Sequence, residues 1–373
     1  MEPVRFIGCG LVCAGVAKGF MLRGLMAEGF HDLLKATSRS FYLTLRVLPA
    51  GVRPQIGLAY LLARTTDTIA DTEILPVAQR LAALQQLRER ILGLTTTPLK
   101  FHELAMQQGS AAERVLLEKV ENSLALLATL SPADLKLVRE VLVTITSGQE
   151  LDLRRFGVLG STALRAPEQK IIALETAAEL DDYTYRVAGC VGEFWTKICR
   201  AHLFPDARLD ERQLIVEGIR FGKGLQLVII LRDLPADLKN GRCYLPTQRL
   251  DEAKLLPETL FSPATTERFL PLFHEYLNKA EAHLTAGWNY TNTLPYGQFR
   301  VRLACAWPIL FGMRTLARLR AADAGQLRSR VKISRGEVWR MIFLSLLASP
   351  LPFAWQRLFA PTRKAVASGE KLA

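Results

Sequence analysis

Apolar residues recur along this chain with the spacing of an α-helix, and this period constrains the fold more than any other feature of the sequence. Within residues 111–130 the apolar residues that follow this spacing include Leu116, Leu117, Val120, Leu124 and Leu127. Alternating runs of Val, Ile and Thr bounded by Asn-Gly turns, which would indicate strands, are almost absent. The sequence therefore predicts an all-α protein, with one helix over residues 111–130.

The helical pattern continues without a break that would divide the chain into domains. No Gly/Ser-rich linker and no internal repeat interrupts it. Ser131-Pro132 and Asp210-Glu211 have the sequence of helix starts, because a side-chain oxygen precedes the first turn. We expect one large domain over residues 30–338, built from about ten helices of ordinary length.

Charge and cysteine usage bear on partners and location. Lys and Arg number 48 against 36 Asp and Glu, a formal net charge of +12, which favours anionic partners such as phosphorylated metabolites or acidic lipids. No basic motif with interleaved aromatic residues indicates nucleic-acid binding. The 6 cysteines form no CxxC pair and the 5 histidines form no ligand cluster. We therefore expect reduced thiols in a cytoplasmic protein.

The N-terminal segment, residues 1–29, reads as an extension to the domain. It contains an apolar, glycine-rich stretch that resembles a short targeting signal, but it lacks a clear charged start and cleavage site. The alternative is that the natural start codon lies further along the chain.

The C-terminal segment, residues 339–373, contains an apolar stretch over residues 341–355. This stretch is too short and too rich in proline to span a bilayer. Its flanking residues are Trp339, Arg340, Trp355 and Arg357, and aromatic and basic residues flank segments that lie in a membrane interface. We expect a membrane-interfacial tail and peripheral membrane association; the alternative is a last core helix.

Two pairs of aspartates carry the chemistry. Asp67 and Asp71 are four residues apart, and so are Asp233 and Asp237. On a helix, residues at i and i+4 lie on one face a few ångströms apart, so the carboxylates of each pair repel unless a cation lies between them. Each pair follows an apolar run. Pro235 within the second pair predicts that its helix ends or bends there.

Two such pairs beside arginines suit a Mg²⁺-dependent diphosphate enzyme. Mg²⁺ takes one or two carboxylates per site and fills its remaining positions with water and phosphate oxygens. Arg64 lies near the first pair, and Arg232 and Arg242 lie near the second. Arginine binds phosphate through two parallel hydrogen bonds. The sequence therefore predicts two Mg²⁺ sites; for either pair alone, the alternative is a solvated helix face.

Five segments in order along residues 36–338 resemble the motifs of one family. They are Ser38-Arg39-Ser40-Phe41 with Leu48-Pro49; Arg64 with Asp67-Thr68-Ile69-Ala70-Asp71; Tyr183-Thr184-Tyr185-Arg186-Val187-Ala188-Gly189; Leu225-Gln226-Leu227 with Leu231-Arg232-Asp233 and Asp237; and Gly241-Arg242-Cys243-Tyr244-Leu245-Pro246. In these segments the chain resembles the squalene/phytoene synthases, enzymes that join two prenyl diphosphates head to head.

The resemblance implies an all-α, single-domain isoprenoid synthase fold with a central active-site cavity. The four aspartates of the two pairs would be catalytic and would hold Mg²⁺ on the two diphosphates, so that a carbocation can form. The residues implied to bind the substrate are Arg39, Ser40, Phe41, Arg64, Gln226 and Arg242. Tyr183 would remove the proton that closes the cyclopropyl intermediate. Arg39 as a surface charge, Phe41 as a core residue and Tyr183 as a buried tyrosine with a satisfied hydroxyl remain alternatives.

The residues favour two branches of the family. Asp67-Thr68, the segment over residues 305–308 and the segment over residues 331–337 resemble squalene synthase, and the last of these is linked to its reductive half-reaction. Tyr185-Arg186 and Tyr244-Leu245-Pro246 resemble phytoene synthase. Val228-Ile229 stands where the family usually has Thr-Asn, and this change removes a polar group near the second metal site.

A nicotinamide cofactor would have to bind outside a Rossmann site, because no GxGxxG opens a βαβ unit. The resemblance implies that Lys332 and Arg335 hold the 2′-phosphate of NADPH. We expect a monomer that condenses two farnesyl diphosphates to presqualene diphosphate and reduces it to squalene with NADPH. The alternatives are synthesis of dehydrosqualene, or of phytoene from geranylgeranyl diphosphate, without reduction, and a catalytically inactive isoprenoid-binding or membrane assembly protein.

Overall fold

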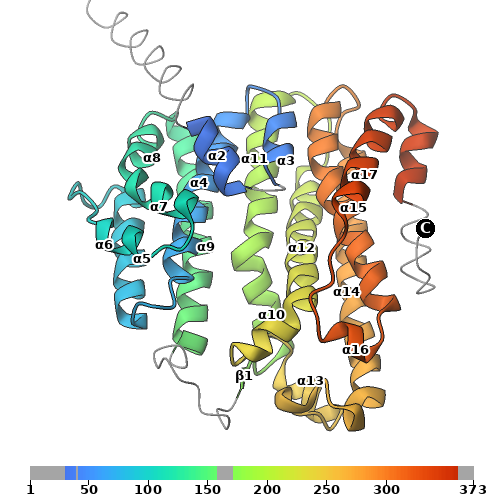
Figure 1. The fold of residues 1–373 in the computed structure, drawn as a ribbon. Coiled ribbons are helices and arrows are strands. Elements are labelled where there is room, and N and C mark those ends of the chain that lie inside the picture. The colour runs from blue at the N-terminus through green and yellow to red at the C-terminus, as the bar shows by residue number, and fades with distance from the viewer. Residues whose placement is uncertain (1–29, 39–40, 158–170, 360–373) are drawn as a thin grey trace, which may run out of the picture.

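The computed structural model describes residues 30–38, 41–157 and 171–359, and nearly all of their regular structure is helical (Figure 1). The all-α prediction is confirmed. In chain order the helices are α2 (His31–Ser38), α3 (Phe41–Val47), α4 (Arg53–Ala70), α5 (Val77–Leu92), α6 (His102–Met106), α7 (Ala111–Glu118), α8 (Val120–Leu127), α9 (Pro132–Phe156), α10 (Ala177–Thr184), the π-helical turn η3 (Tyr185–Gly189), α11 (Cys190–Leu203), α12 (Glu211–Lys239), α13 (Thr247–Glu252), the 3₁₀ turns η4 (Pro257–Thr259) and η5 (Pro263–Thr265), α14 (Thr266–Thr293), α15 (Phe299–Ala321), α16 (Ala324–Leu327) and α17 (Arg335–Ala348). The strands in the described residues are β1 (Ile172–Ala173) and β2 (Arg242–Cys243), which pair in parallel.

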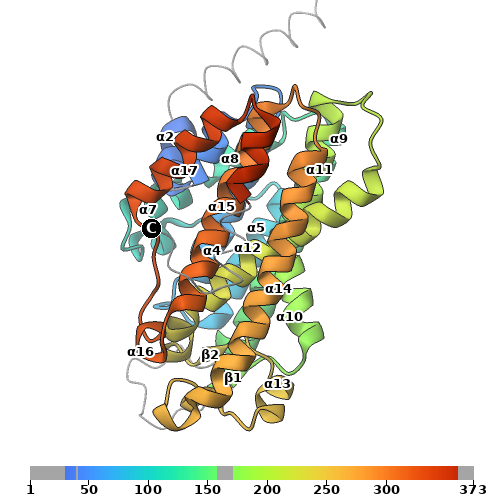
Figure 2. The same cartoon turned by 90° about the vertical axis from the view of Figure 1, so that its right-hand side faces the viewer.

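The longest helices run roughly along one axis, and they form two groups. Figure 1 shows α4 and α9 on one side, α14 and α15 on the other, and α11 and α12 between them; in Figure 2 the side that carries α14 and α15 faces the viewer. Apolar residues of α4, α5, α8 and α9 form an N-terminal core that includes Leu61, Leu84 and Leu142. Apolar residues of α12, α14 and α15 form a C-terminal core that includes Leu231 and Phe273. The described residues therefore contain two large hydrophobic cores, together with a smaller buried cluster that includes Cys199 and Tyr290.

Helix starts were predicted well from sequence. The Ser131 side chain accepts a hydrogen bond from the backbone N–H of Asp134 at the start of α9. The Asp210 side chain accepts one from Gln213 at the start of α12. Each contact satisfies a backbone donor that a helix leaves unpaired in its first turn.

Helix lengths and interruptions differ from the sequence predictions. The helix predicted over residues 111–130 is two helices, α7 and α8, which part at Lys119. The helix that contains Pro235 does not end there, since α12 continues to Lys239. Helices α12, with 29 residues, and α14, with 28 residues, are also longer than the ordinary length expected from the sequence. Burial against neighbouring helices stabilises such lengths, which local sequence signals do not reveal.

The C-terminal segment has a buried side and an exposed side. Helix α17 begins with a capping box between Ser334 and Glu337, and residues 352–359 form a further helix. The Trp355 ring is 2% exposed and stacks on Trp288 with centroids 5.3 Å apart. The predicted boundary between residues 338 and 339 therefore falls inside α17, and this part of the chain contributes to the C-terminal core.

The opposite side of this segment carries exposed apolar side chains: Trp339, Phe343, Leu344, Leu346, Leu347, Leu351 and Phe353. Among the residues that the structure describes, no helix has the length and apolar character needed to cross a membrane. The N-terminal extension, residues 1–29, lies outside the described residues.

Helix α12 approaches α11 and the η3 turn backbone to backbone, with one glycine contact to each. A Cβ atom built on Gly192 would lie 1.9 Å from the carbonyl oxygen of Gly218, and one built on Gly222 would lie 2.1 Å from that of Ala188. Only glycine permits this distance. The contact brings the η3 turn, and with it the end of α10, against the helix that carries the second aspartate pair.

Candidate active site

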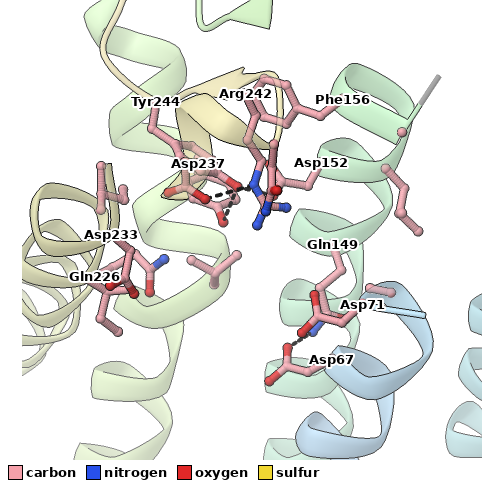
Figure 3. Close-up of a pocket in the computed structure, with 18 of the residues that line it drawn as sticks. Asp67, Asp71, Gln149, Asp152, Phe156, Gln226, Asp233, Asp237, Arg242 and Tyr244 are labelled. Carbon is pink, nitrogen blue, oxygen red and sulfur yellow. Dashed lines mark hydrogen bonds and ion pairs between the residues drawn. The ribbon is translucent and has the colours of Figure 1, made fainter. Parts of the chain in front are cut away.

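A cavity of about 410 Å³ lies between α4 and α9 on one side and α12 on the other. Residues of α10 and of the segment around β2 also line it. Figure 3 shows the aspartates of α12 on one side and those at the end of α4 on the other. The sequence-predicted residues that the fold brings together here are Asp67, Asp71, Tyr183, Gln226, Asp233, Asp237 and Arg242.

The first aspartate pair lies where α4 ends. Asp71 is the C-cap residue of this helix, one turn beyond Asp67. The side-chain amide of Gln149 donates a hydrogen bond to Asp67, and Arg64 Nη1 lies 3.8 Å from Asp67 Oδ2. Loss of hydration, followed by repulsion from Asp71, raises the pKa of Asp67 to about 7, against the opposing effects of Arg64 and Gln149. A cation at this pair would relieve that repulsion.

The second pair, on α12, is held by arginines. Arg242 Nε lies 2.9 Å from Asp237 Oδ1. Asp233 is bound by two guanidinium groups, with Arg232 Nη2 at 2.7 Å from Oδ2 and Arg330 Nε at 2.7 Å from Oδ1. Burial favours the protonated form of Asp233, but the hydrogen bonds and charges of the two arginines outweigh it and hold the pKa of Asp233 below its usual range. Asp233 is therefore ionised, and its oxygens are bound by the two guanidinium groups.

The turn after α12 aims two side chains into the cavity. Gly241 has a φ of 73°, a left-handed conformation that glycine adopts without strain, and it ends the helix. The next two residues pair with β1, with Arg242 opposite Ile172 and Cys243 opposite Ala173. Side chains alternate along an extended segment. Arg242 and Tyr244 therefore both line the cavity, while Cys243 is buried in the C-terminal core.

A second polar group in the cavity joins two tyrosines to a carboxylate. Tyr183 and Tyr244 stack with ring centroids 4.9 Å apart, and their hydroxyl oxygens lie 3.4 Å apart. The Tyr244 hydroxyl donates to Asp152 Oδ2 at 2.6 Å. Burial raises the pKa of Asp152 to about 6, against the opposing effects of Tyr244, Arg242, Tyr183 and Arg155. Burial also raises the pKa of both tyrosines well above the usual value.

The charge of the lining differs from that of the whole protein. Six carboxylates and two guanidinium groups line the cavity, a formal charge of −4 in a chain of net charge +12. Gln149 Oε1 is buried and has no hydrogen-bond partner among the described residues. Within the same residues, no group of three or more His, Cys, Asp or Glu side chains could by itself hold a metal ion. A pair of hard carboxylate ligands nevertheless fits Mg²⁺, which completes its coordination with water and phosphate oxygens.

Several predicted site residues lie elsewhere. Arg39 and Ser40 fall outside the described residues. Phe41 does not line the cavity; its ring stacks on that of Tyr60, at the edge of the N-terminal core. Lys332 and Arg335 are exposed and do not line the cavity either.

Arg64 does not line the cavity; it forms an ion pair with Glu113 as well as with Asp67. Ile229, the residue that stands where the family usually has Asn, does line the cavity, one helical turn before Asp233.

Sequence reasoning missed Gln149 and Asp152 on α9, and Arg330 before α17. One signal was available for the first two. The buried side of α9 includes Leu142, Ile145 and Phe156, and the helical spacing places Gln149 and Asp152 on that same side. Polar residues on the apolar side of a helix indicate a site or a buried network.

Comparison with known proteins decides the family. A family model described as squalene/phytoene synthase matches residues 34–337. The chain belongs to the squalene/phytoene synthase family.

The chain is similar in sequence to curated proteins with different named activities. The chain is 28% identical to a bifunctional lycopene cyclase/phytoene synthase of Blakeslea trispora, over 74% of this chain and 42% of that protein. It is 26% identical to the squalene synthase of Schizosaccharomyces pombe, over 85% of this chain and 64% of that protein. It is 31% identical to the presqualene diphosphate synthase of Sinorhizobium fredii, over 58% of this chain and 62% of that protein. The chain thus spans less than two thirds of each relative's length.

Solved structures agree with the fold. The structure of TcSQS in complex with the ligand BPH1237 superposes with a TM-score of 0.73 at 21% identity, and covers 94% of this chain and 92% of that one. The predicted single-domain helical fold of this family is therefore confirmed.

Proposed function

We propose that this protein condenses two farnesyl diphosphates to presqualene diphosphate in a Mg²⁺-dependent reaction, and then reduces this product to squalene with NADPH. The observation that carries the proposal is that two aspartate pairs face each other across one cavity whose lining has a formal charge of −4. An anionic diphosphate enters such a site only with cations, and two pairs suit two diphosphates.

The two aspartate pairs and Arg242 would have different roles in binding the diphosphates. Asp67 and Asp71 would hold Mg²⁺ on one side of the cavity, and Asp233 and Asp237 on the other. When bound, Mg²⁺ would neutralise the negative charge of the departing diphosphate. Arg242, paired with Asp237, is placed to contact a phosphate oxygen.

The apolar part of the lining fits the rest of the substrate. Leu153, Phe156, Val187, Ile229 and Ile230 line the cavity next to the charged groups. Apolar walls would take an isoprenoid chain and keep water from a carbocation.

The direct test is product analysis with radiolabelled farnesyl diphosphate, with and without Mg²⁺. Asp67→Asn and Asp233→Asn should each abolish turnover while leaving helix content unchanged. Asp251→Asn, on the exposed surface of α13, is the matched control and should keep wild-type activity. Wild-type rates in Asp67→Asn or Asp233→Asn would contradict the two-site proposal.

The reductive step needs a separate measurement. Adding NADPH should change the product from presqualene diphosphate to squalene, and replacing Lys332 and Arg335 with Gln should weaken this effect if they hold the cofactor phosphate. The phytoene synthase relative and Ile229 in the cavity favour a second candidate, condensation without reduction. An identical product with and without NADPH would support that candidate and contradict the first.

We also propose peripheral membrane association through the exposed side of the C-terminal segment. Trp339, Phe343, Leu347 and Phe353 are 58–69% exposed there. Arg357 lies over the Phe353 ring at 4.1 Å, which places a cation beside this apolar surface. Such a surface suits insertion into the interface of an anionic bilayer, and a hydrocarbon product needs an apolar phase to enter.

A flotation assay with anionic vesicles tests the membrane proposal. Because Trp355 is buried, truncation would damage the core, so substitution of exposed residues is the better perturbation. Replacing Phe343, Leu347 and Phe353 with Ser should release the protein from vesicles and spare condensation activity. Replacing Ile74 and Leu94, each 73% exposed elsewhere, with Ser should leave flotation unchanged. Equal flotation of both variants would contradict the proposal.

A further inference from the structure

We infer that Asp152 is the final acceptor of the proton that leaves the substrate when the cyclopropane ring closes, and that Tyr183 and Tyr244 relay the proton to it. This inference rests on the proposed function, because it concerns the condensation step. It adds a catalytic carboxylate that belongs to neither aspartate pair.

The hydrogen bonds form one chain with a single direction. Tyr183 donates from its hydroxyl to that of Tyr244 at 3.4 Å, and Tyr244 donates to Asp152 Oδ2 at 2.6 Å. The first distance is long, as catalytic hydrogen bonds often are before the substrate binds. All three side chains line the cavity, so the chain begins where a substrate can reach it. The donors already point along the path that the proton would follow.

Tyr183 needs such a partner to act as a base. Its burial strongly disfavours a phenolate, and the same holds for Tyr244. A neutral hydroxyl can accept a proton only if it passes its own proton on at the same time. Asp152 is the carboxylate at the end of the chain, and its Oδ1 has no hydrogen-bond partner among the described residues.

The step balances in atoms and charge. A C–H bond of the carbocation breaks, and its electron pair forms the new C–C bond of the ring. The proton passes to the Tyr183 oxygen, the Tyr183 proton to Tyr244, and the Tyr244 proton to the Asp152 carboxylate. The positive charge of the cation and the negative charge of the carboxylate are both removed, and both tyrosines end neutral.

The surroundings keep Asp152 suited to this role. Arg155 on α9, Arg242 on β2, Tyr183 on α10 and Tyr244 after β2 are the ionisable groups that act on it, and all four favour the carboxylate against burial. The balance leaves its pKa at about 6. Asp152 is thus ionised at neutral pH, yet basic enough to retain a proton for part of the catalytic cycle.

The test compares Asp152→Asn, Tyr244→Phe, the double variant and Tyr290→Phe. Asn keeps an oxygen that can accept from Tyr244, so the geometry survives while the proton acceptor is lost. Tyr290 is a tyrosine of α14 that is 1% exposed and bonded to Thr196, outside the cavity lining, and it controls for the loss of a buried hydroxyl. The readouts are the rate of presqualene diphosphate formation between pH 5 and pH 8, and Mg²⁺-dependent binding of farnesyl thiodiphosphate, an unreactive analogue.

We expect presqualene diphosphate formation to fall about 100-fold or more in Asp152→Asn and in Tyr244→Phe, with no further loss in the double variant. Analogue binding should stay near wild type in all variants, and Tyr290→Phe should keep its rate. The wild-type rate should fall as the pH drops, because Asp67, with a pKa of about 7, and Asp152, with a pKa of about 6, are both protonated in acid. In Asp152→Asn the part of this fall near pH 6 should be lost, and the part that belongs to Asp67 should remain.

Three results would overturn the inference: a near-wild-type rate in Asp152→Asn, a fall in rate near pH 6 that persists unchanged in that variant, or additive losses in the double variant. Loss of analogue binding in Asp152→Asn would assign it a structural role and also count against the relay. If Asp152→Asn does not fold, the comparison of Tyr244→Phe with Tyr290→Phe decides the outcome. The rate of presqualene diphosphate formation should fall about 100-fold or more in the first variant and stay near wild type in the second. If the wild-type protein forms no presqualene diphosphate at all, it is the proposed function that fails.

Discussion

The contact between α11 and α12 makes Gly192→Ala a quantitative test of the fold around the cavity. The new Cβ would lie 1.9 Å from the carbonyl oxygen of Gly218 and 2.3 Å from its carbonyl carbon. An ordinary contact begins near 3.4 Å, so the two backbones must separate by about 1.5 Å. Neither partner can rotate away, because both are main chain. We expect a loss of about 3 kcal/mol in the free energy of unfolding, at the upper end for overpacking.

This loss can be measured as a shift in melting temperature. An unfolding entropy of about 2.1 cal/mol/K per residue gives about 0.8 kcal/mol/K for the whole chain, so the midpoint should fall by about 4 °C. Gly109→Ala is the control, because nothing lies within 4 Å of its added Cβ and its midpoint should stay unchanged. Since α12 carries the second aspartate pair, analogue binding should weaken in Gly192→Ala as well. A midpoint within 1 °C of wild type, measured with the precision of about 0.5 °C that such a shift needs, would refute the close approach.

Two other predictions concern the segment before and in α17. Glu337→Gln should cost about 2 kcal/mol at pH 7, because Glu337 accepts from Arg314 and Arg318 and caps the helix. The pKa of Glu337 is lowered from 4.5 to about 2, so its contribution is present above pH 4.5 and lost as the pH falls towards 2. Melting curves of both proteins should therefore converge on acidification; a constant difference would contradict this. Arg330→Gln should strengthen Mg²⁺ binding several-fold in calorimetry, because Arg330 occupies an oxygen of Asp233 that the metal needs; unchanged or weaker binding would contradict this.

The parts of the site that depend only on residues within one helical turn of each other could be predicted from the sequence. Asp67 and Asp71 share a helix face by virtue of a four-residue separation, and the same holds for Asp233 and Asp237. The capping side chains of Ser131 and Asp210 likewise act within one turn. Such features need no knowledge of which helices meet.

The parts that depend on distant contacts could not be predicted. Asp152 meets Tyr244 across 92 residues of sequence, and Arg330 meets Asp233 across 97. Pro235 predicts a helix end or a bend because its lost hydrogen bond is a local cost; the end does not occur, since packing of α12 on its neighbours carries the helix to Lys239. The sequence predicts that the C-terminal segment is either a membrane-interfacial tail or a core helix. In the structure one side of the segment is exposed and apolar, and the other side is buried and contains Trp355.

The position of the cavity between the two cores links substrate binding to the cohesion of the whole molecule. One wall belongs to helices of the N-terminal core and the other to α12 and β2 of the C-terminal core, and carboxylates on both walls repel one another. A ligand that bridges the walls through cations replaces this repulsion with attraction and binds only when both halves are folded and in place. At 100 times its dissociation constant, such a ligand adds about 2.7 kcal/mol to the folded state. The protein with a bridging ligand is therefore more resistant to unfolding than the empty one, and the added stability requires both walls of the cavity to be in place at once.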